Sequence, residues 1–140
     1  MHAIIALMSK STHFIPLIVA HRGDSANSPE NTLAAFRLAL ENGADGIELD
    51  VMLSADKNLV VIHDDTLERT SNGNGKVSDM PFAALRELDA GSWYDLKFKG
   101  EPIPLLDEVF SEFGGKFLIN VELKNYQTPK INSPNSWLQW

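Results

Sequence analysis

The sequence contains no cysteine among its 140 residues. Disulfide bonds, thiolate metal ligands and a cysteine nucleophile are therefore excluded, so any catalytic chemistry has to come from oxygen and nitrogen side chains. Basic residues are also few, since 12 lysines and arginines stand against 19 aspartates and glutamates and give a formal net charge of −7. Because a nucleic-acid surface needs clustered Lys and Arg and these are scattered, no nucleic-acid partner is expected.

Long apolar runs are missing as well. The first twenty residues, MHAIIALMSKSTHFIPLIVA, hold two short apolar patches that the polar residues 10–13 separate. They lack both a basic start and the roughly twenty unbroken apolar residues of a membrane span. We therefore expect neither a signal peptide nor a membrane span, and a soluble, cytoplasmic protein with residues 1–14 as an N-terminal extension. The sequence does not indicate an oligomeric state.

A strand, a helix and a second strand follow this extension. Residues 15–20 form a continuous apolar run, typical of a strand that is buried on both faces. In the stretch SPENT, Ser28 is predicted to cap a helix with Pro29 at its first position, and Gly43 is predicted to end this helix. Residues 45–53, DGIELDVML, then form the next strand, parallel to the first. This pattern predicts a parallel α/β fold.

The rest of the chain contains further short elements. A hairpin strand is predicted at residues 59–63, after a turn in which Asn58 takes the left-handed conformation. A short helix is predicted near residues 82–88, and a longer helix over residues 106–113, where apolar residues recur at helical spacing. Residues 117–123 form the next predicted strand.

Acidic residues interrupt two of the predicted strands. In GIELDVML, Glu48 and Asp50 alternate with apolar residues and therefore share one face of the strand. In NVELK, Glu122 and Lys124 alternate with apolar residues in the same way. Converging carboxylates repel one another unless a cation neutralises them, and oxygen ligands favour a hard ion, Mg²⁺ or Ca²⁺. The alternative is that Arg or Lys pairs with these acids in a structural network, which the spacing of Glu48 and Asp50 alone would favour.

Histidines follow two of the strands, within AHRG and IHD. His21 and His63 thus lie at strand ends beside the acids, where imidazoles suit acid-base chemistry near neutral pH. Arg22 offers a planar fork that binds phosphate oxygens, and Lys124 offers a point charge. Lys124 is alternatively expected to form a salt bridge with Glu122 or Glu48.

These motifs together resemble one family. The stretches VAHRGDSANSPENTLAAF, GIELDVML, VVIHDDTLERTSNGNG, LRELDAGSW, IPLLDEVF and NVELK are similar, in order, to the glycerophosphodiester phosphodiesterase family. The resemblance implies a (βα)8 TIM barrel that hydrolyses a glycerophosphodiester, a small-molecule substrate, to an alcohol and sn-glycerol 3-phosphate with a divalent metal. It also implies the roles of seven residues: Glu48, Asp50 and Glu122 bind Mg²⁺ or Ca²⁺, His21 and His63 are the catalytic acid-base pair, and Arg22 and Lys124 bind the substrate phosphate.

The resemblance also predicts how the chain is organised. A (βα)8 barrel takes ~250 residues, so residues 15–125 are expected to be a partial domain, the first three barrel strands of an incomplete barrel. The family's insertion is expected at about residues 65–100, and an irregular tail at residues 126–140. Two residues have open roles: Glu30 either supports the site or simply starts the helix, and Trp93 either lines the substrate mouth or packs the insertion.

Two other functions remain open at this point. One is a lysophospholipase D-type lipid hydrolase on the same barrel, for which Trp93, Tyr94 and Phe98 would supply an apolar rim. The other is a non-catalytic fragment that binds a metal or a partner. An incomplete barrel would hold its catalytic groups loosely, and a misplacement of about 1 Å costs ~10²-fold in rate. The chain on its own is therefore expected to be an inefficient phosphodiesterase.

Overall fold

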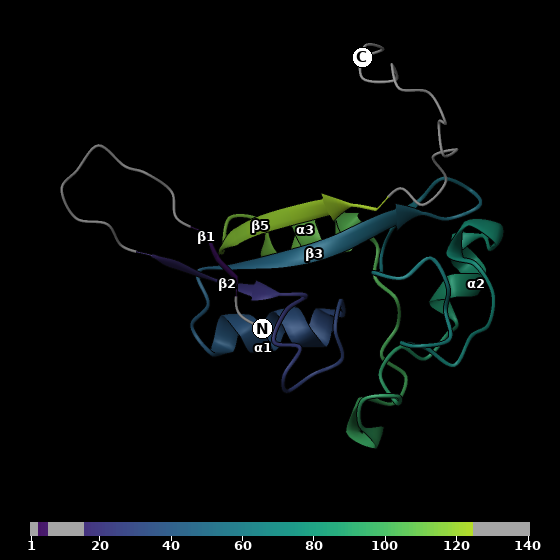
Figure 1. Cartoon of the computed structure of the whole chain (residues 1–140), viewed down its shortest axis with the longest axis horizontal. Helices are drawn as coiled ribbons and strands as arrows, with labels where there is room; N and C mark the ends of the chain where they lie inside the picture. Colours follow the sequence, from purple (N-terminus) through teal and green to yellow (C-terminus); the bar gives the residue numbers. More distant parts are fainter. Residues whose placement is uncertain (1–2, 6–15, 125–140) are drawn as a thin grey trace, which may run out of the picture.

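The computed structural model describes residues 3–5 and 16–124 of the chain, and within them one sheet holds five strands (Figure 1). The strands are β1 (Ala3–Ile5), β2 (Leu17–His21), β3 (Gly46–Leu53), β4 (Leu59–Val61) and β5 (Leu118–Leu123). β3 pairs in parallel with β2 and with β5. The predicted parallel α/β architecture is confirmed, and β2 to β5 begin and end within two residues of their predicted bounds.

β3 is the centre of the sheet, and its two edges have different partners. Along one edge, β2 pairs with its first residues, Gly46–Glu48, and β4 pairs antiparallel with its last residues, Val51–Leu53. Along the other edge, β5 runs parallel over residues 46–51. The register places Asp50 opposite Glu122 and places His21 opposite Glu48. The acidic residues of neighbouring strands are therefore brought together by backbone pairing.

Two helices cover the apolar face of this sheet. They are α1 (Leu33–Glu41) and α3 (Leu106–Phe113), and both contribute buried side chains to one hydrophobic cluster. The cluster consists of Ala20, Phe36, Ala39, Ile47, Leu49, Val51, Val61, Leu106, Val109 and Phe113. Because burying one large apolar side chain contributes about 1.5–3 kcal/mol, this cluster fixes which face of β3 points away from the helices. The acids occupy that other face.

The start of α1 differs from the prediction. The N-cap is Thr32, whose hydroxyl accepts a hydrogen bond from the Ala35 amide, and Ser28 caps nothing. Asn31 has a φ of 58°, a left-handed conformation that does not belong to a helix. Its backbone amide donates to the Arg22 carbonyl instead. The stretch SPENT is therefore a turn that folds back onto the end of β2.

The turn between β3 and β4 also differs from the prediction. Lys57, with a φ of 67°, takes the left-handed conformation that was expected at Asn58. The Asn58 carbonyl accepts from the Ser54 amide, and the Asn58 amide donates to the Ser54 hydroxyl. These two bonds already place Asn58 in the strand register, so the preceding residue has to make the turn.

The predicted insertion forms a second cluster beside β3 and β4, on one side of the sheet (Figure 1). It contains the 3₁₀ helices η1 (Val77–Asp79) and η2 (Leu96–Phe98) and the helix α2 (Phe82–Arg86). Its buried side chains pack with residues of β3 and β4: Met52, Val60, Ile62, Leu67, Val77, Leu85, Ala90 and Ile103.

Two aromatic residues of the insertion hold loops in place. The Trp93 indole donates to the Ala90 carbonyl, and its ring meets Tyr94 edge to face. The Tyr94 hydroxyl donates to the Ala26 carbonyl, in the loop between β2 and α1. Trp93 thus packs within the insertion, and Tyr94 attaches the insertion to the sheet.

The edges of the sheet are unequal. β1, which lies in the predicted N-terminal extension, pairs antiparallel with β2, whereas β5 has β3 as its only partner among the described strands. The predicted tail, residues 126–140, lies outside the described residues. None of the helices in the described part of the chain is both long and apolar enough to span a membrane.

Candidate active site

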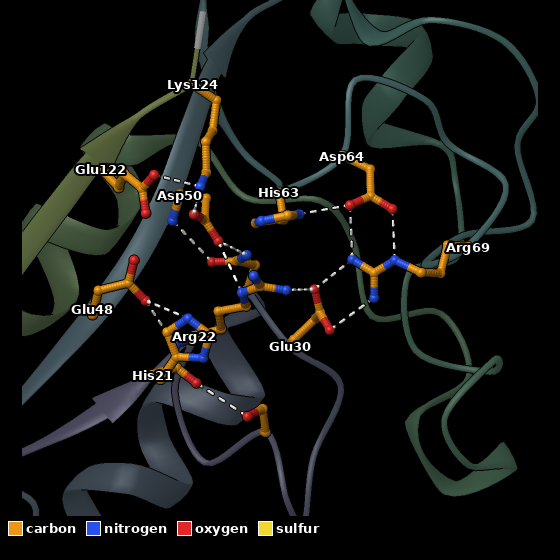
Figure 2. A network of polar contacts seen from close by, with 12 residues as sticks. His21, Arg22, Glu30, Glu48, Asp50, His63, Asp64, Arg69, Glu122 and Lys124 are labelled. Carbon is orange, nitrogen blue, oxygen red and sulfur yellow. Dashed lines mark hydrogen bonds and ion pairs between the residues drawn. The ribbon is translucent and has the colours of Figure 1, made fainter. Parts of the chain in front are cut away.

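Three carboxylates converge on the face of the sheet that the helices leave open (Figure 2). Glu48 and Asp50 come from β3 and Glu122 comes from β5, and one oxygen of each lies within 4.8 Å of the others. Glu48 and Asp50 are buried, at 7% and 0% exposure, whereas Glu122 is exposed. The structure thus brings together the three acids that strand alternation placed on one face.

Two basic side chains flank Asp50. Lys124 Nζ lies 3.1 Å from Asp50 Oδ1 and also pairs with Glu122, and Arg22 Nε lies 3.2 Å from Asp50 Oδ2. Burial lowers the pKa of Lys124, but its hydrogen bonds to Glu122 and Asp50 outweigh burial and raise this pKa above its ordinary value. The predicted pair of Lys124 with Glu122 is present, and its second partner is Asp50 rather than Glu48.

Glu48 is the least neutralised of the three acids. Burial raises its pKa, and the negative charge of Asp50 raises the pKa further. Glu48 Oε2 accepts a hydrogen bond of 3.2 Å from the Arg22 backbone amide and lies 3.8 Å from His21 Nε2. The site therefore contains a buried carboxylate whose charge the neighbouring cations do not fully compensate.

The residues present fit a hard divalent cation. Asp50 Oδ1 is buried and makes no hydrogen bond beyond its ion pair with Lys124. The three converging ligand atoms are all carboxylate oxygens, which is the ligand type that Mg²⁺ and Ca²⁺ prefer. The cluster could hold a metal ion at this place.

Asn31 holds Asp50 from the loop before α1. Its side-chain amide donates to Asp50 Oδ2 at 2.9 Å, and its side-chain carbonyl accepts from the Asp50 backbone amide at 3.2 Å. Asn31 is buried and has a φ of 58°, and Arg22 has a φ of 61°. Two left-handed residues that are not glycine are typical of functional sites. No role of Asn31 was apparent from the sequence, although Asn tolerates this conformation better than most residues.

The two histidines lie at different ends of the site. His21 ends β2, and burial followed by the charge of Arg22 lowers its pKa. His63 follows β4, and its Nδ1 lies 2.6 Å from Asp64 Oδ1. Hydrogen bonds from Arg69 and then from His63 lower the pKa of Asp64 to about 2. Asp64 was not apparent as a site residue from the sequence, although it directly follows His63.

Glu30 connects the two ends (Figure 2). It accepts from Arg22 Nη1 at 2.9 Å, and from Arg69 Nη1 and Nη2 at 2.9 and 2.8 Å. Burial raises the pKa of Glu30, but the hydrogen bonds and charges of the two arginines outweigh burial and lower it. Of its two open roles, Glu30 has the one that supports the site, because it lies outside the helix and between two arginines. Arg69 was not found from the sequence.

Acids and basic side chains gather near the carboxyl ends of the parallel strands β2, β3 and β5, which is where α/β-barrel enzymes have their active sites. The comparisons identify the family: residues 21–134 match the Glycerophosphoryl diester phosphodiesterase family. A glycerophosphodiester phosphodiesterase of Caldanaerobacter subterraneus subsp. tengcongensis is 57% identical over 110 residues, which are 78% of this chain and 45% of that protein. The chain therefore belongs to this family.

Solved structures agree with this assignment. The crystal structure of glycerophosphodiester phosphodiesterase from Agrobacterium tumefaciens matches with a TM-score of 0.75 and 50% identity, over 76% of this chain and 46% of that chain. An Oleispira antarctica phosphodiesterase in complex with the product sn-glycerol-3-phosphate matches with a TM-score of 0.71 and 47% identity, over 76% and 43%. These neighbours are TIM-barrel enzymes, so the predicted fold class is confirmed. The chain spans about half the length of the relatives it matches.

Proposed function

We propose that this chain carries one part of the active site of a glycerophosphodiester phosphodiesterase, which yields an alcohol and sn-glycerol 3-phosphate. The observation that carries the proposal is the convergence of Glu48, Asp50 and Glu122 within 4.8 Å, beside two cations. Family membership supports it, as does the product complex of the Oleispira relative.

Glu48, Asp50 and Glu122 would hold the metal, Mg²⁺ or Ca²⁺. A bound cation of this kind polarises a phosphoryl group and stabilises the charge that develops on it. Lys124 adds to this electrostatic stabilisation, because an ammonium has three donors and two of them face Asp50 and Glu122. The remaining donor of Lys124 suits a phosphate oxygen, and Arg22 adds positive charge on the other side of Asp50.

His21 and His63 are the proposed acid-base pair. One imidazole takes the proton of the attacking hydroxyl group, and the other gives a proton to the departing alkoxide. The attacking group is either water or the 2-hydroxyl of the glycerol moiety. A cyclic glycerol phosphate in quenched reactions would identify attack by the 2-hydroxyl, and its absence throughout turnover would identify attack by water.

Metal binding by the chain itself tests the proposal. We expect calorimetric titration with Mg²⁺ or Ca²⁺ to show one site that Glu48→Gln and Asp50→Asn each remove. Glu112→Gln is the matched control, since Glu112 pairs with Arg37 on the helix face. Hydrolysis of glycerophosphocholine, followed as released sn-glycerol 3-phosphate, should depend on the same metal. Unchanged metal affinity in both site variants would overturn the proposal.

A lysophospholipase D-type activity is the second candidate. The insertion exposes Leu96 at 78% and Trp93 at 40%, and exposed apolar side chains of this kind suit contact with an acyl chain. Faster hydrolysis of lysophosphatidylcholine than of glycerophosphocholine would favour this activity, and Leu96→Ser should then reduce only the lipid reaction. Metal binding without hydrolysis of either substrate would favour a non-catalytic chain.

A further inference from the structure

Arg69, in the insertion, binds two carboxylates at once (Figure 2). Its Nε donates to Asp64 Oδ2 at 2.6 Å and its Nη2 donates to Asp64 Oδ1 at 3.1 Å. On its other side, Nη1 and Nη2 donate to Glu30 at 2.9 and 2.8 Å. Two bidentate contacts require the planar guanidinium with its five donors, which a lysine cannot reproduce.

Asp64 connects Arg69 to His63. Its Oδ1, which Arg69 already binds, lies 2.6 Å from His63 Nδ1. A carboxylate at this nitrogen favours the tautomer that carries its proton on Nδ1, because a carboxylate only accepts hydrogen bonds. In that neutral tautomer the lone pair of the ring is on Nε2. The position of Asp64 thus decides which ring nitrogen of His63 is able to take up a proton.

Glu30, the second carboxylate that Arg69 binds, connects Arg69 to the three converging acids. Glu30 also accepts from Arg22 Nη1, and Arg22 Nε lies 3.2 Å from Asp50. The contacts therefore run without a break from β3 through the loop after β2 to the loop after β4. Single ion pairs of a side chain that is 43% exposed, as Arg69 is, contribute little. A connected network with bidentate geometry is the exception, because each partner already holds the next one in place.

We propose that Arg69 is a positioning residue that fixes the tautomer and the orientation of His63 through Asp64, with Glu30 as its anchor. Its described ion pairs reach Glu30 and Asp64 and none of the three converging acids. Arg69 therefore reaches His63 through Asp64. The catalytic use of this tautomer rests on the proposed function of His63, whereas the tautomer itself does not.

The tautomer of His63 is measurable in the chain without any turnover. The sequence has four histidines, so nitrogen-15 NMR of the imidazoles, with His63→Gln for assignment, resolves the ring of interest. We expect the Nδ1-protonated form of neutral His63 in the unsubstituted chain. Arg69→Gln should shift the tautomer ratio toward Nε2-protonated by about tenfold, the size expected for a weakened charge-assisted hydrogen bond. Arg69→Lys should not restore the ratio.

Arg37→Gln is the matched control, because Arg37 makes an equivalent bidentate contact with Glu112 away from the site. It should leave the His63 signals unchanged, and backbone amide spectra should show that each variant keeps the fold. An unaltered tautomer ratio in folded Arg69→Gln would overturn the inference. If the ratio shifts but His63→Ala retains full turnover, the positioning role stands and the proposed catalytic role of His63 is wrong.

Discussion

In the metal-free protein, Asp50→Asn should lower the stability, whereas Glu48→Gln should not. Burial raises the pKa of Glu48, and the charge of Asp50 raises it further. The folded state therefore binds this proton more readily than the unfolded state does, so its stabilising effect is present at low pH and is lost as the pH rises through the raised pKa. Glutamine carries no charge and keeps an oxygen for the Arg22 amide. At pH 7, Glu48→Gln should leave the free energy of unfolding unchanged or increase it.

Asp50→Asn removes the negative charge that pairs with two basic side chains. Asp50 is fully buried, and the side chains of Arg22 and Lys124 are 18% and 15% exposed. Removing one partner of a buried pair costs about 3–5 kcal/mol, and we expect the lower end of this range, about 3 kcal/mol, because both cations retain a second carboxylate partner. With an m-value of about 1.5 kcal/mol/M, the urea midpoint should fall by about 2 M.

Urea unfolding at pH 7 with a chelator, followed by circular dichroism, measures both effects. Glu122→Gln is the control, since Glu122 belongs to the same cluster but its side chain is 54% exposed, and we expect a loss below about 1 kcal/mol. The reasoning fails if Glu48→Gln destabilises the protein as much as Asp50→Asn does. It also fails if Asp50→Asn and Glu122→Gln have the same midpoint.

Three further predictions concern the same site. His21→Ala and His63→Ala, each introduced into a barrel completed with the strands of a relative, should lower turnover by ~10²-fold to 10⁴-fold with the fold intact, and losses below tenfold would contradict acid-base roles. Gly46→Ala should weaken metal binding in calorimetry, because its Cβ would lie 2.7 Å from the Leu118 carbonyl oxygen and push β5 away from β3; unchanged affinity would show that the strand spacing does not set the site. On acidification, metal affinity should begin to fall at a higher pH than a Glu of ordinary pKa would give, since the pKa of Glu48 is raised; a profile that follows an ordinary Glu would contradict this.

The convergence of the acids followed from the sequence because it depends on backbone rules. Side chains alternate along a strand, and the apolar face of β3 has to meet the helices. Once Glu48 and Asp50 share the opposite face, parallel pairing brings Glu122 beside Asp50. The face on which each strand side chain lies can be predicted from the alternation of apolar and polar residues within a short stretch of sequence. The strand bounds and the position of α3 were found for the same reason.

The loop residues could not be found in this way. Asn31 contacts Asp50 across 19 positions, and Arg69 contacts Glu30 across 39. These contacts depend on left-handed residues at Arg22 and Asn31, which turn the loop between β2 and α1 back onto the sheet. The stretch SPENT has equally good local signals for a helix start, and only its tertiary contacts make it a turn. Side-chain pairs between loops leave no period in the sequence.

The basic side chains of the network do not neutralise all of its carboxylates. Five carboxylates of the network face three basic side chains, so two negative charges remain when the histidines are neutral. One divalent ion neutralises two charges. The acid nearest to this excess is Glu48, whose pKa is raised by burial and then by the charge of Asp50. The arginines and the lysine therefore hold the acids in register, and they leave a charge deficit that suits a divalent metal rather than a third basic residue. The members of the network are Glu30, Glu48, Asp50, Asp64 and Glu122 with Arg22, Arg69 and Lys124.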